Sequence, residues 1–224
     1  MLHLLIRGLL APLARLLYRP VVRGADNVPE RGAVLLAANH HAAVDTAVLG
    51  IVSPRSVKFL GKAEYFAGKG LKGRLFAGFL SALGYVPVER GNAKAGLAAL
   101  EAARAVLHDG GVFGIYPEGT RSLDGRLHRG HTGVAALALA TGAVVVPVAL
   151  SGTEKVQPVG KRIPRIARVV VRFGAPLDFS RYDGMNASPA VRRAVTDEIM
   201  YAIMELSQQE YVDTYHARPE SGAA

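Results

Sequence analysis

TGVAALALATGAVVVPVALSGT, residues 132–153, is the stretch that decides the fold class of this chain. It carries no charged side chain, and a membrane-spanning helix needs about 20 such apolar residues. However, Thr141, Gly142 and Pro147 interrupt it, and its composition changes from Ala and Leu before Gly142 to Val after it. Ala and Leu favour helix, whereas Val favours strand. The stretch therefore predicts a helix, a tight turn and a buried strand rather than a membrane span.

The same alternation of helical patterns and Val-rich runs continues toward both ends of the chain. The predicted strands are Val21–Arg23, Ala33–Ala38, Val57–Leu60, Val112–Tyr116, Val144–Ala149 and Arg168–Phe173. The predicted helices are Leu4–Leu17, Ala43–Val52, Leu71–Leu83, Ala93–His108, Thr132–Ala140 and Ala190–Gln209. Such alternation is typical of an α/β fold. We predict a single α/β domain with a mixed, mostly parallel sheet that helices cover on both faces.

Residues 1–20 are predicted to form an amphipathic helix that associates with a membrane. Arg7 and Arg15 divide this Leu-rich segment and Pro12 lies in its middle, so no apolar run is long enough to span a bilayer. No small-residue cleavage site follows, which argues against a signal peptide. A helix lying in the lipid interface and a helix packed on the core both fit the pattern. A globular domain is predicted over residues 21–215 and a flexible tail over 216–224.

Residues 71–83 form a second candidate membrane-facing helix. Leu and Phe recur there at helical spacing, and Lys69, Lys72 and Arg74 lie at its start. Basic residues beside an apolar face are typical of helices that bind anionic lipid surfaces. An ordinary core helix with a basic end is the alternative.

The charge balance of the chain indicates an anionic partner. The chain has 27 Lys and Arg against 18 Asp and Glu, a formal net charge of +9, which favours nucleic acid, anionic lipid or phosphorylated ligands. Its 8 Tyr and 7 Phe do not alternate with basic runs as base-stacking surfaces would, so nucleic acid is not a predicted partner. The absence of cysteine excludes disulfides, thiolate metal sites and an acyl-cysteine intermediate.

The segment NHHAAVD, residues 39–45, carries the strongest chemical signal. It follows a predicted strand and leads into a predicted helix, so His40 lies at a strand end and Asp45 in the first helical turn. Across such a turn a carboxylate can hold one ring nitrogen protonated and leave the other free as a base. No serine nucleophile accompanies the pair, which indicates that the reacting hydroxyl belongs to a substrate. A structural His40 with Asp45 at a helix N-terminus is the alternative.

Three further blocks accompany the His–Asp pair. YPEGTRS, residues 116–122, ends a predicted strand, and its Glu118 and Arg121 place a carboxylate and a guanidinium where α/β folds bind ligands. Arginine can hold a phosphate through two parallel hydrogen bonds. GYVPVER, residues 84–90, ends in Arg90, and VPVAL, residues 146–150, indicates only a buried strand. A structural Glu–Arg pair and an exposed surface arginine are the alternatives for the first two blocks.

The four blocks together resemble, in order and spacing, those of the glycerolipid acyltransferase family, and bacterial 1-acylglycerol-3-phosphate acyltransferases are the most similar members. That family has a His-x4-Asp motif, a Gly-x5-Arg block, a Phe-Pro-Glu-Gly-Thr-Arg-Ser block and a Val-Pro-Val/Ile block. The resemblance covers residues 21–175. It implies that residues 21–215 are an acyltransferase domain and that the chain moves a fatty acyl group to the free hydroxyl of 1-acylglycerol 3-phosphate, which makes phosphatidic acid.

The resemblance also implies roles for individual residues. His40 would be the general base and Asp45 would orient it, while Arg90 and Arg121 would bind the acceptor's phosphate. Glu118 would hold the acceptor or brace the loop. The remaining residues placed at the substrate are Gly119, Thr120, Arg129 and Lys62; Arg129 stands where the family often has Lys, and Lys62 follows a predicted strand. A further difference is Tyr116, which replaces the usual Phe.

The implied reaction is a direct transfer within a ternary complex, because the chain offers no evident covalent nucleophile. The donor is acyl-CoA or acyl carrier protein, no cofactor or metal is predicted, and backbone amides near Gly119 are candidates to stabilise the oxyanion. Membrane lipids and a lysophospholipid acceptor are the predicted partners, at the cytoplasmic face of the cell membrane. Glycerol 3-phosphate or another lysolipid as acceptor, and a non-catalytic protein that binds anionic lipid, are the alternatives.

One other pair of residues has the spacing of metal ligands. His128 and His131 are three residues apart, but no third ligand is evident near them in the sequence. The pair alone therefore does not predict a metal site.

Overall fold

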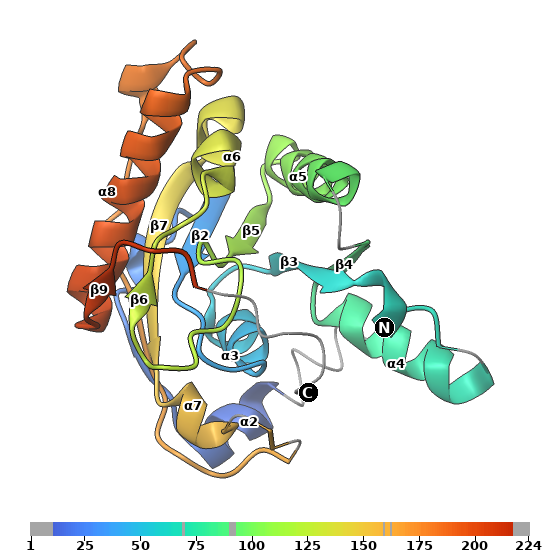
Figure 1. Ribbon diagram of the computed structural model, residues 1–224. Coiled ribbons are helices and arrows are strands. Elements are labelled where there is room, and N and C mark those ends of the chain that lie inside the picture. The colour runs from blue at the N-terminus through green and yellow to red at the C-terminus, as the bar shows by residue number, and fades with distance from the viewer. Residues whose placement is uncertain (1–10, 69, 90–92, 159, 162, 217–224) are drawn as a thin grey trace.

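A seven-stranded sheet forms the centre of the computed structural model, which describes residues 11–216 except 69, 90–92, 159 and 162 (Figure 1). Its strands lie in the order β1-β8-β7-β2-β5-β3-β4. They are β1 (Val21–Arg23), β2 (Val34–Ala38), β3 (Val57–Lys62), β4 (Tyr85–Val88), β5 (Val112–Ile115), β7 (Val144–Ser151) and β8 (Val170–Phe173). Neighbouring strands run parallel except β7 and β8, which are antiparallel. The sheet is thus mixed and mostly parallel, as predicted.

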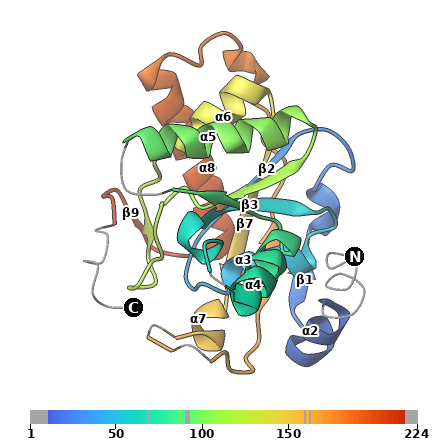
Figure 2. The same ribbon diagram turned by 90° about the vertical axis from the view of Figure 1, so that its right-hand side faces the viewer.

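Helices cover both faces of this sheet (Figure 2). One face carries α5 (Ala93–His108), α6 (Gly133–Thr141) and α8 (Pro189–Ser207). The other carries α3 (Asp45–Val52) and the short α7 (Thr153–Val156), with α2 (Ala11–Tyr18) beside them and α4 (Gly70–Ala82) next to β4. Three short 3-10 helices, η2 (Ala25–Asn27), η3 (Ala63–Tyr65) and η4 (Ser180–Tyr182), lie in the described connections.

The central strand β2 divides the core into two layers. All five of its residues are buried, because it pairs with β5 on one side and β7 on the other while helices cover both faces. Leu35 and Ala37 pack with α5, α6 and α8, whereas Val34, Leu36 and Ala38 pack with α3 and α7. This alternation explains why the strand reads as a continuous apolar run.

A second, two-stranded sheet attaches the C-terminal segment to the loop that follows β5. In it, β6 (Leu127–His128) pairs in parallel with β9 (Tyr211–Val212), and His128 lies opposite Val212. The polypeptide after α8 therefore returns to the vicinity of residues 116–131.

The structure confirms the predicted α/β fold, and the predicted strands are present with ends shifted by one or two residues. β6, β9 and α7 were not predicted, because two-residue strands and a four-residue helix show no periodic pattern, and β4 was missed because Pro87 interrupts its apolar run. The prediction of α8 up to Gln209 was wrong at its end: Gln208 adopts a left-handed conformation, with φ of 60°, and terminates the helix. Helix α3 begins at Asp45 rather than at Ala43.

The N-terminal helix is described only from Ala11, so the predicted start at Leu4 lies outside the described residues. The tail 217–224 also lies outside them, and the boundary at residue 20 stays a prediction. Within the described part of the chain, the helices are all too short or too polar to cross a membrane.

Candidate active site

The shared direction of the parallel strands brings the candidate residues to one edge of the sheet. His40 follows the carboxyl end of β2, Tyr116 follows that of the neighbouring β5, and Lys62 ends β3, which runs parallel to β5. The carboxyl ends of parallel strands meet at the same edge, where α/β folds bind their ligands. The two blocks 39–45 and 116–122 therefore form one site although they are far apart in sequence.

His40 and Asp45 contact each other as the sequence predicted. Asp45 Oδ2 lies 2.8 Å from His40 Nδ1, and it also accepts hydrogen bonds from the backbone N–H groups of His41 at 2.6 Å and Ala42 at 2.8 Å. Asp45 is fully buried, whereas the His40 side chain is 16% exposed. With the Asp45 carboxylate at Nδ1, the other ring nitrogen, Nε2, is left available to accept a proton.

Tyr116 supports the imidazole from one side. Its ring stacks on that of His40 with centroids 3.9 Å apart and planes 13° apart. The Tyr116 hydroxyl forms a hydrogen bond of 3.0 Å with Thr46 Oγ1, in the first turn of α3. Burial and the nearby Asp45 carboxylate raise the pKa of Tyr116 well above its usual value, so the phenol stays neutral. Tyr116 therefore offers His40 the same aromatic ring as the family's Phe, and its hydroxyl adds a hydrogen bond to α3.

Glu118 braces the loop from inside the protein. Its Oε1 accepts a hydrogen bond from the backbone N–H of His128 at 2.9 Å, and its Oε2 accepts one from the backbone N–H of His40 at 3.3 Å. Its side chain is buried, with 2% of the residue exposed. Burial raises the pKa of Glu118 to about 7, although the two backbone N–H groups act in the opposite direction. Of the two predicted roles, these contacts favour bracing over contact with an acceptor.

Two further contacts of the site were missed from the sequence. The backbone N–H of Ser122 donates to the carbonyl of His40 at 2.7 Å, which joins the two blocks directly. The buried Asn39 side chain accepts from the N–H of Leu150 at 2.7 Å and donates to its carbonyl at 3.0 Å. Asn39 therefore fastens the end of β2 to β7, and a buried amide directly after an apolar strand was the signal that could have indicated it.

Apart from the buried Glu118, the predicted ligand-binding residues of block 116–122 are at least partly exposed. Gly119 is exposed and has a φ of 72°, and its N–H donates to the Tyr116 carbonyl at 3.0 Å. That N–H is therefore already used within a turn, and the suggestion that backbone amides near Gly119 stabilise the oxyanion stays a prediction. Thr120 is half-buried and Arg121 is exposed.

The remaining predicted cations are distributed more widely. Lys62 is exposed at the end of β3. Arg129 lies with its Nε 3.6 Å from Asp213 Oδ1 and its guanidinium 5.5 Å from the centre of the Tyr215 ring, so it contacts the C-terminal segment. Arg90 lies outside the described residues.

The geometry of the His–Asp pair and the Glu118 loop coincides with a family match. A family model described as acyltransferase matches residues 19–151 of the chain. The chain belongs to the acyltransferase family. The matched part begins before β1 and ends with β7, so it contains His40, Asp45 and the whole 116–122 block.

Relatives of this acyltransferase-family chain share one kind of name. The chain is 31% identical over 168 residues to the chloroplastic 1-acyl-sn-glycerol-3-phosphate acyltransferase LPAT1 of Arabidopsis thaliana, which covers 74% of the chain and 46% of the plant protein. It is 27% identical over 192 residues to 1-acyl-sn-glycerol-3-phosphate acyltransferase of Bacillus subtilis, and the aligned part covers 84% of this chain and 89% of that protein.

The chain spans less than half the length of the plant relatives, since it covers 40% of the chloroplastic BAT2 protein of Brassica napus. In structure, the chain is similar to the lysophosphatidate acyltransferase PlsC from Thermotoga maritima, with a TM-score of 0.63 at 22% identity over 89% of this chain and 81% of that one. That likeness confirms the fold of the acyltransferase-family chain.

Proposed function

We propose that the chain is an O-acyltransferase that moves a fatty acyl group from acyl-CoA or acyl carrier protein to the free hydroxyl of 1-acylglycerol 3-phosphate. The product is phosphatidic acid, so the chain acts in phospholipid biosynthesis. The observation that carries the proposal is the contact of 2.8 Å between His40 Nδ1 and the buried Asp45 carboxylate, within a chain of the acyltransferase family. The names of its relatives support the choice of acceptor.

The chemical step uses the free nitrogen of His40. The acceptor hydroxyl gives its proton to Nε2 while its oxygen attacks the carbonyl carbon of the thioester. The tetrahedral adduct then expels the thiolate, which takes the proton back from the imidazolium. Asp45 stabilises the imidazolium and keeps the ring in the productive tautomer. Because the acceptor itself attacks the donor, no acyl-enzyme forms, and both substrates must be bound together.

Exposed cations around this edge of the sheet serve the acceptor's phosphate. Arg121 precedes Ser122, whose backbone N–H bonds the His40 carbonyl, and Lys62 ends a strand at the same edge. Arg90 completes this set as a prediction. Arg129 is the weaker candidate, because its guanidinium already contacts Asp213 and Tyr215.

The surface around α2 suits a peripheral position on the membrane. Leu13, Leu16 and Leu17 are exposed on α2. Ile163 and Ile166, on the loop before β8, are 81% and 70% exposed. Exposed basic residues flank these apolar side chains, namely Arg15, Arg19, Lys161, Arg165 and Arg168. Apolar side chains within a basic surface are typical of proteins that lie on anionic lipid, which fits the cytoplasmic face of the cell membrane.

An apolar cavity lies behind this surface, where a hydrocarbon group could lodge. It has a volume of about 130 Å³ and lies between α2, α3 and the region before β8. Its wall consists almost entirely of apolar atoms, contributed by residues that include Tyr18, Val48, Ile51, Val156 and Pro164. Val44, the neighbour of Asp45, also lines it, so the cavity begins one residue from the catalytic pair.

The test of the proposed function is an assay of thiol release with a long-chain acyl-CoA and a panel of acceptors. The panel contains 1-acylglycerol 3-phosphate, glycerol 3-phosphate and an uncharged lysolipid, and mass spectrometry identifies the lipid products. We expect release that requires both substrates and gives phosphatidic acid fastest. Lipid binding without thiol release for any acceptor would contradict an enzymatic function. Faster transfer to glycerol 3-phosphate than to 1-acylglycerol 3-phosphate would contradict the proposed acceptor.

A further inference from the structure

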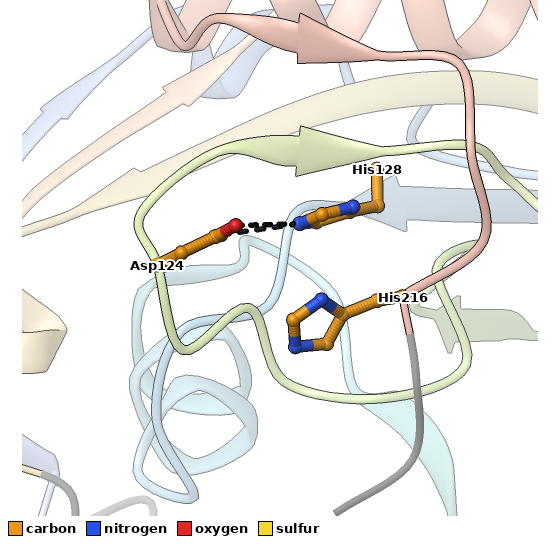
Figure 3. Close-up of side chains that lie close together, drawn as sticks. All are labelled: Asp124, His128 and His216. Atoms are coloured by element: carbon orange, nitrogen blue, oxygen red, sulfur yellow. Dashed lines mark hydrogen bonds and ion pairs between the residues drawn. The ribbon is translucent and has the colours of Figure 1, made fainter.

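Three potential metal ligands from two distant parts of the chain converge beside the site. Asp124 and His128 lie in the loop that contains β6, and His216 reaches them from the segment after β9 (Figure 3). One ligand atom from each residue, a carboxylate oxygen or a ring nitrogen, lies within 4.8 Å of the other two. The His128 and His216 rings have centroids 4.3 Å apart and planes tilted by 46°.

The spacing within this cluster suits a metal ion. His128 Nε2 lies 3.1 Å from both oxygens of Asp124. Zinc binds histidine nitrogen and carboxylate oxygen at about 2.0–2.2 Å, so two ligand atoms on one zinc ion lie roughly 3 Å apart. The Asp124–His128 edge already has this length, and His216 needs a movement of only about 1–2 Å to reach the same length, as follows from those bond lengths.

We propose that Asp124, His128 and His216 bind one Zn²⁺ ion, which fastens the C-terminal segment to the loop that follows Glu118. Two imidazoles and one carboxylate favour Zn²⁺ and similar transition metals over Mg²⁺ and Ca²⁺, which prefer oxygen ligands. Water completes the coordination, because Asp124 is exposed.

The surroundings of Asp124 are compatible with such an ion. Its Oδ1 accepts a hydrogen bond from Ser122 Oγ at 3.0 Å, a contact of the kind that orients ligating carboxylates. Its Oδ2 lies 2.9 Å from the Arg126 guanidinium, but the Arg126 side chain is 45% exposed and that of Asp124 is 31% exposed. An exposed pair of this kind contributes only about 0–1 kcal/mol. Arg126 can therefore turn outward into water when the ion binds.

The ion would act on the loop that braces the His40 backbone. The backbone N–H of His128 donates to Glu118, whose other oxygen accepts from the backbone N–H of His40. A ligated His128 would therefore hold in place the end of this chain of hydrogen bonds that lies opposite His40. Since β6 and β9 pair through only two residues each, a metal clamp would add substantially to their attachment.

The test is a titration of the full-length chain, freed of metal by a chelator, with Zn²⁺ in a calorimeter and with Co²⁺ followed by visible absorption. We expect one ion per chain, a higher melting temperature with Zn²⁺, and no displacement by equimolar Mg²⁺. His216→Ala and Asp124→Ala should each weaken binding at least about 10–100-fold, the loss typical of disturbed metal sites. They are preferred to His128→Ala because the buried His128 supports the fold.

The matched control is His131→Ala. His131 lies in the same neighbourhood, where its ring stacks on that of Tyr215 at 4.6 Å, but it is not one of the three ligands. Zn²⁺ binding should be unchanged in this variant. Saturable binding that survives both His216→Ala and Asp124→Ala, or that is lost only in a His40→Ala, His41→Ala double variant, would overturn the proposal, as would no saturable binding at all.

Discussion

The protein contains two imidazole–carboxylate pairs that differ in which partner is buried. In the first, the Asp45 side chain is fully buried and that of His40 is 16% exposed. In the second, the His128 side chain is 6% exposed and that of Asp124 is 31% exposed. A buried carboxylate that is fixed by backbone N–H groups can orient an imidazole whose other nitrogen faces a substrate. An exposed carboxylate beside a buried imidazole instead leaves its oxygens open to a cation.

The origin of the two pairs also differs. Asp45 reaches His40 across a single turn at the start of α3, and its other two hydrogen bonds come from His41 and Ala42. Asp124 and His128 contact each other within one loop. His216 lies next to them because β6 pairs with β9, which precedes it in the chain. The first pair is therefore complete within one turn, whereas the second meets its third group, His216, only through the fold of the whole chain.

The largest expected effect is on acyl-transfer activity, which should depend on His40 far more than on His128. His40→Ala removes the proposed base, and a positioned base contributes about 10²–10⁴-fold. We expect kcat/KM for acyl transfer to fall by at least about 10³ while the circular dichroism spectrum is unchanged. His108→Ala, at the exposed end of α5, is the control. An equal loss of activity per folded molecule in His128→Ala would break the distinction between the pairs.

The two carboxylates should differ in their contribution to stability. Asp45→Ala leaves the N–H groups of His41 and Ala42 without their acceptor, and each unsatisfied buried donor costs about 1–3 kcal/mol. We expect a loss of about 3–4 kcal/mol in the free energy of unfolding, measured with urea. Asp124→Ala in metal-free protein should cost less, about 1–2 kcal/mol, because its pair with Arg126 is exposed and chiefly the buried His128 ring loses a partner. Equal losses at the two positions would contradict the comparison.

Glu118, which lies between the two pairs, should make stability depend on pH. Its pKa is about 7 in the folded protein and near the ordinary value of 4.5 when unfolded, so the folded state binds the extra proton between these values. Stability contributed by this group is therefore present at low pH and falls as the pH rises from 4.5 to 7, by about 3 kcal/mol.

Urea unfolding of metal-free protein across that pH range measures this dependence. Glu118→Gln cannot ionise, so its stability should vary less between pH 4.5 and 7 than that of the wild type. Identical pH profiles for the two proteins would show that Glu118 does not keep a raised pKa, and the bracing carboxyl would then be ionised throughout.

The smallest expected effect concerns the phenol ring that stacks on His40 in the first pair. Tyr116→Phe keeps the ring stacked on His40 and removes the hydrogen bond to Thr46. The loss of one such bond costs about 0.5–1.5 kcal/mol in stability. We expect kcat to fall less than about 10-fold, since that is the rate equivalent of roughly 1.4 kcal/mol. A loss as large as that of His40→Ala would mean that the phenol itself takes part in the reaction.

Much of the fold could be predicted because it depends on long apolar patterns. The buried β2 and β7 read as continuous apolar runs, and the helices between strands show their own period. β6 and β9 could not be predicted in this way, since strands of two residues carry no alternation, and Pro87 interrupts the short apolar run of β4. Likewise, the motif left open whether Glu118 holds the acceptor or braces the loop, because the backbone N–H groups that bond its carboxyl belong to His40 and His128 on other segments.

By itself, the sequence determined the class of the fold and the His40–Asp45 pair, because apolar periodicity and a contact across one helical turn both act over a few residues. Only the tertiary structure decided which loops meet at the carboxyl edge of the sheet, that Tyr116 lies flat on His40, and that His128 faces Asp124 and His216 rather than acting with His131. Those contacts join segments far apart in the chain. They arise from strand order and burial, to which every part of the core contributes.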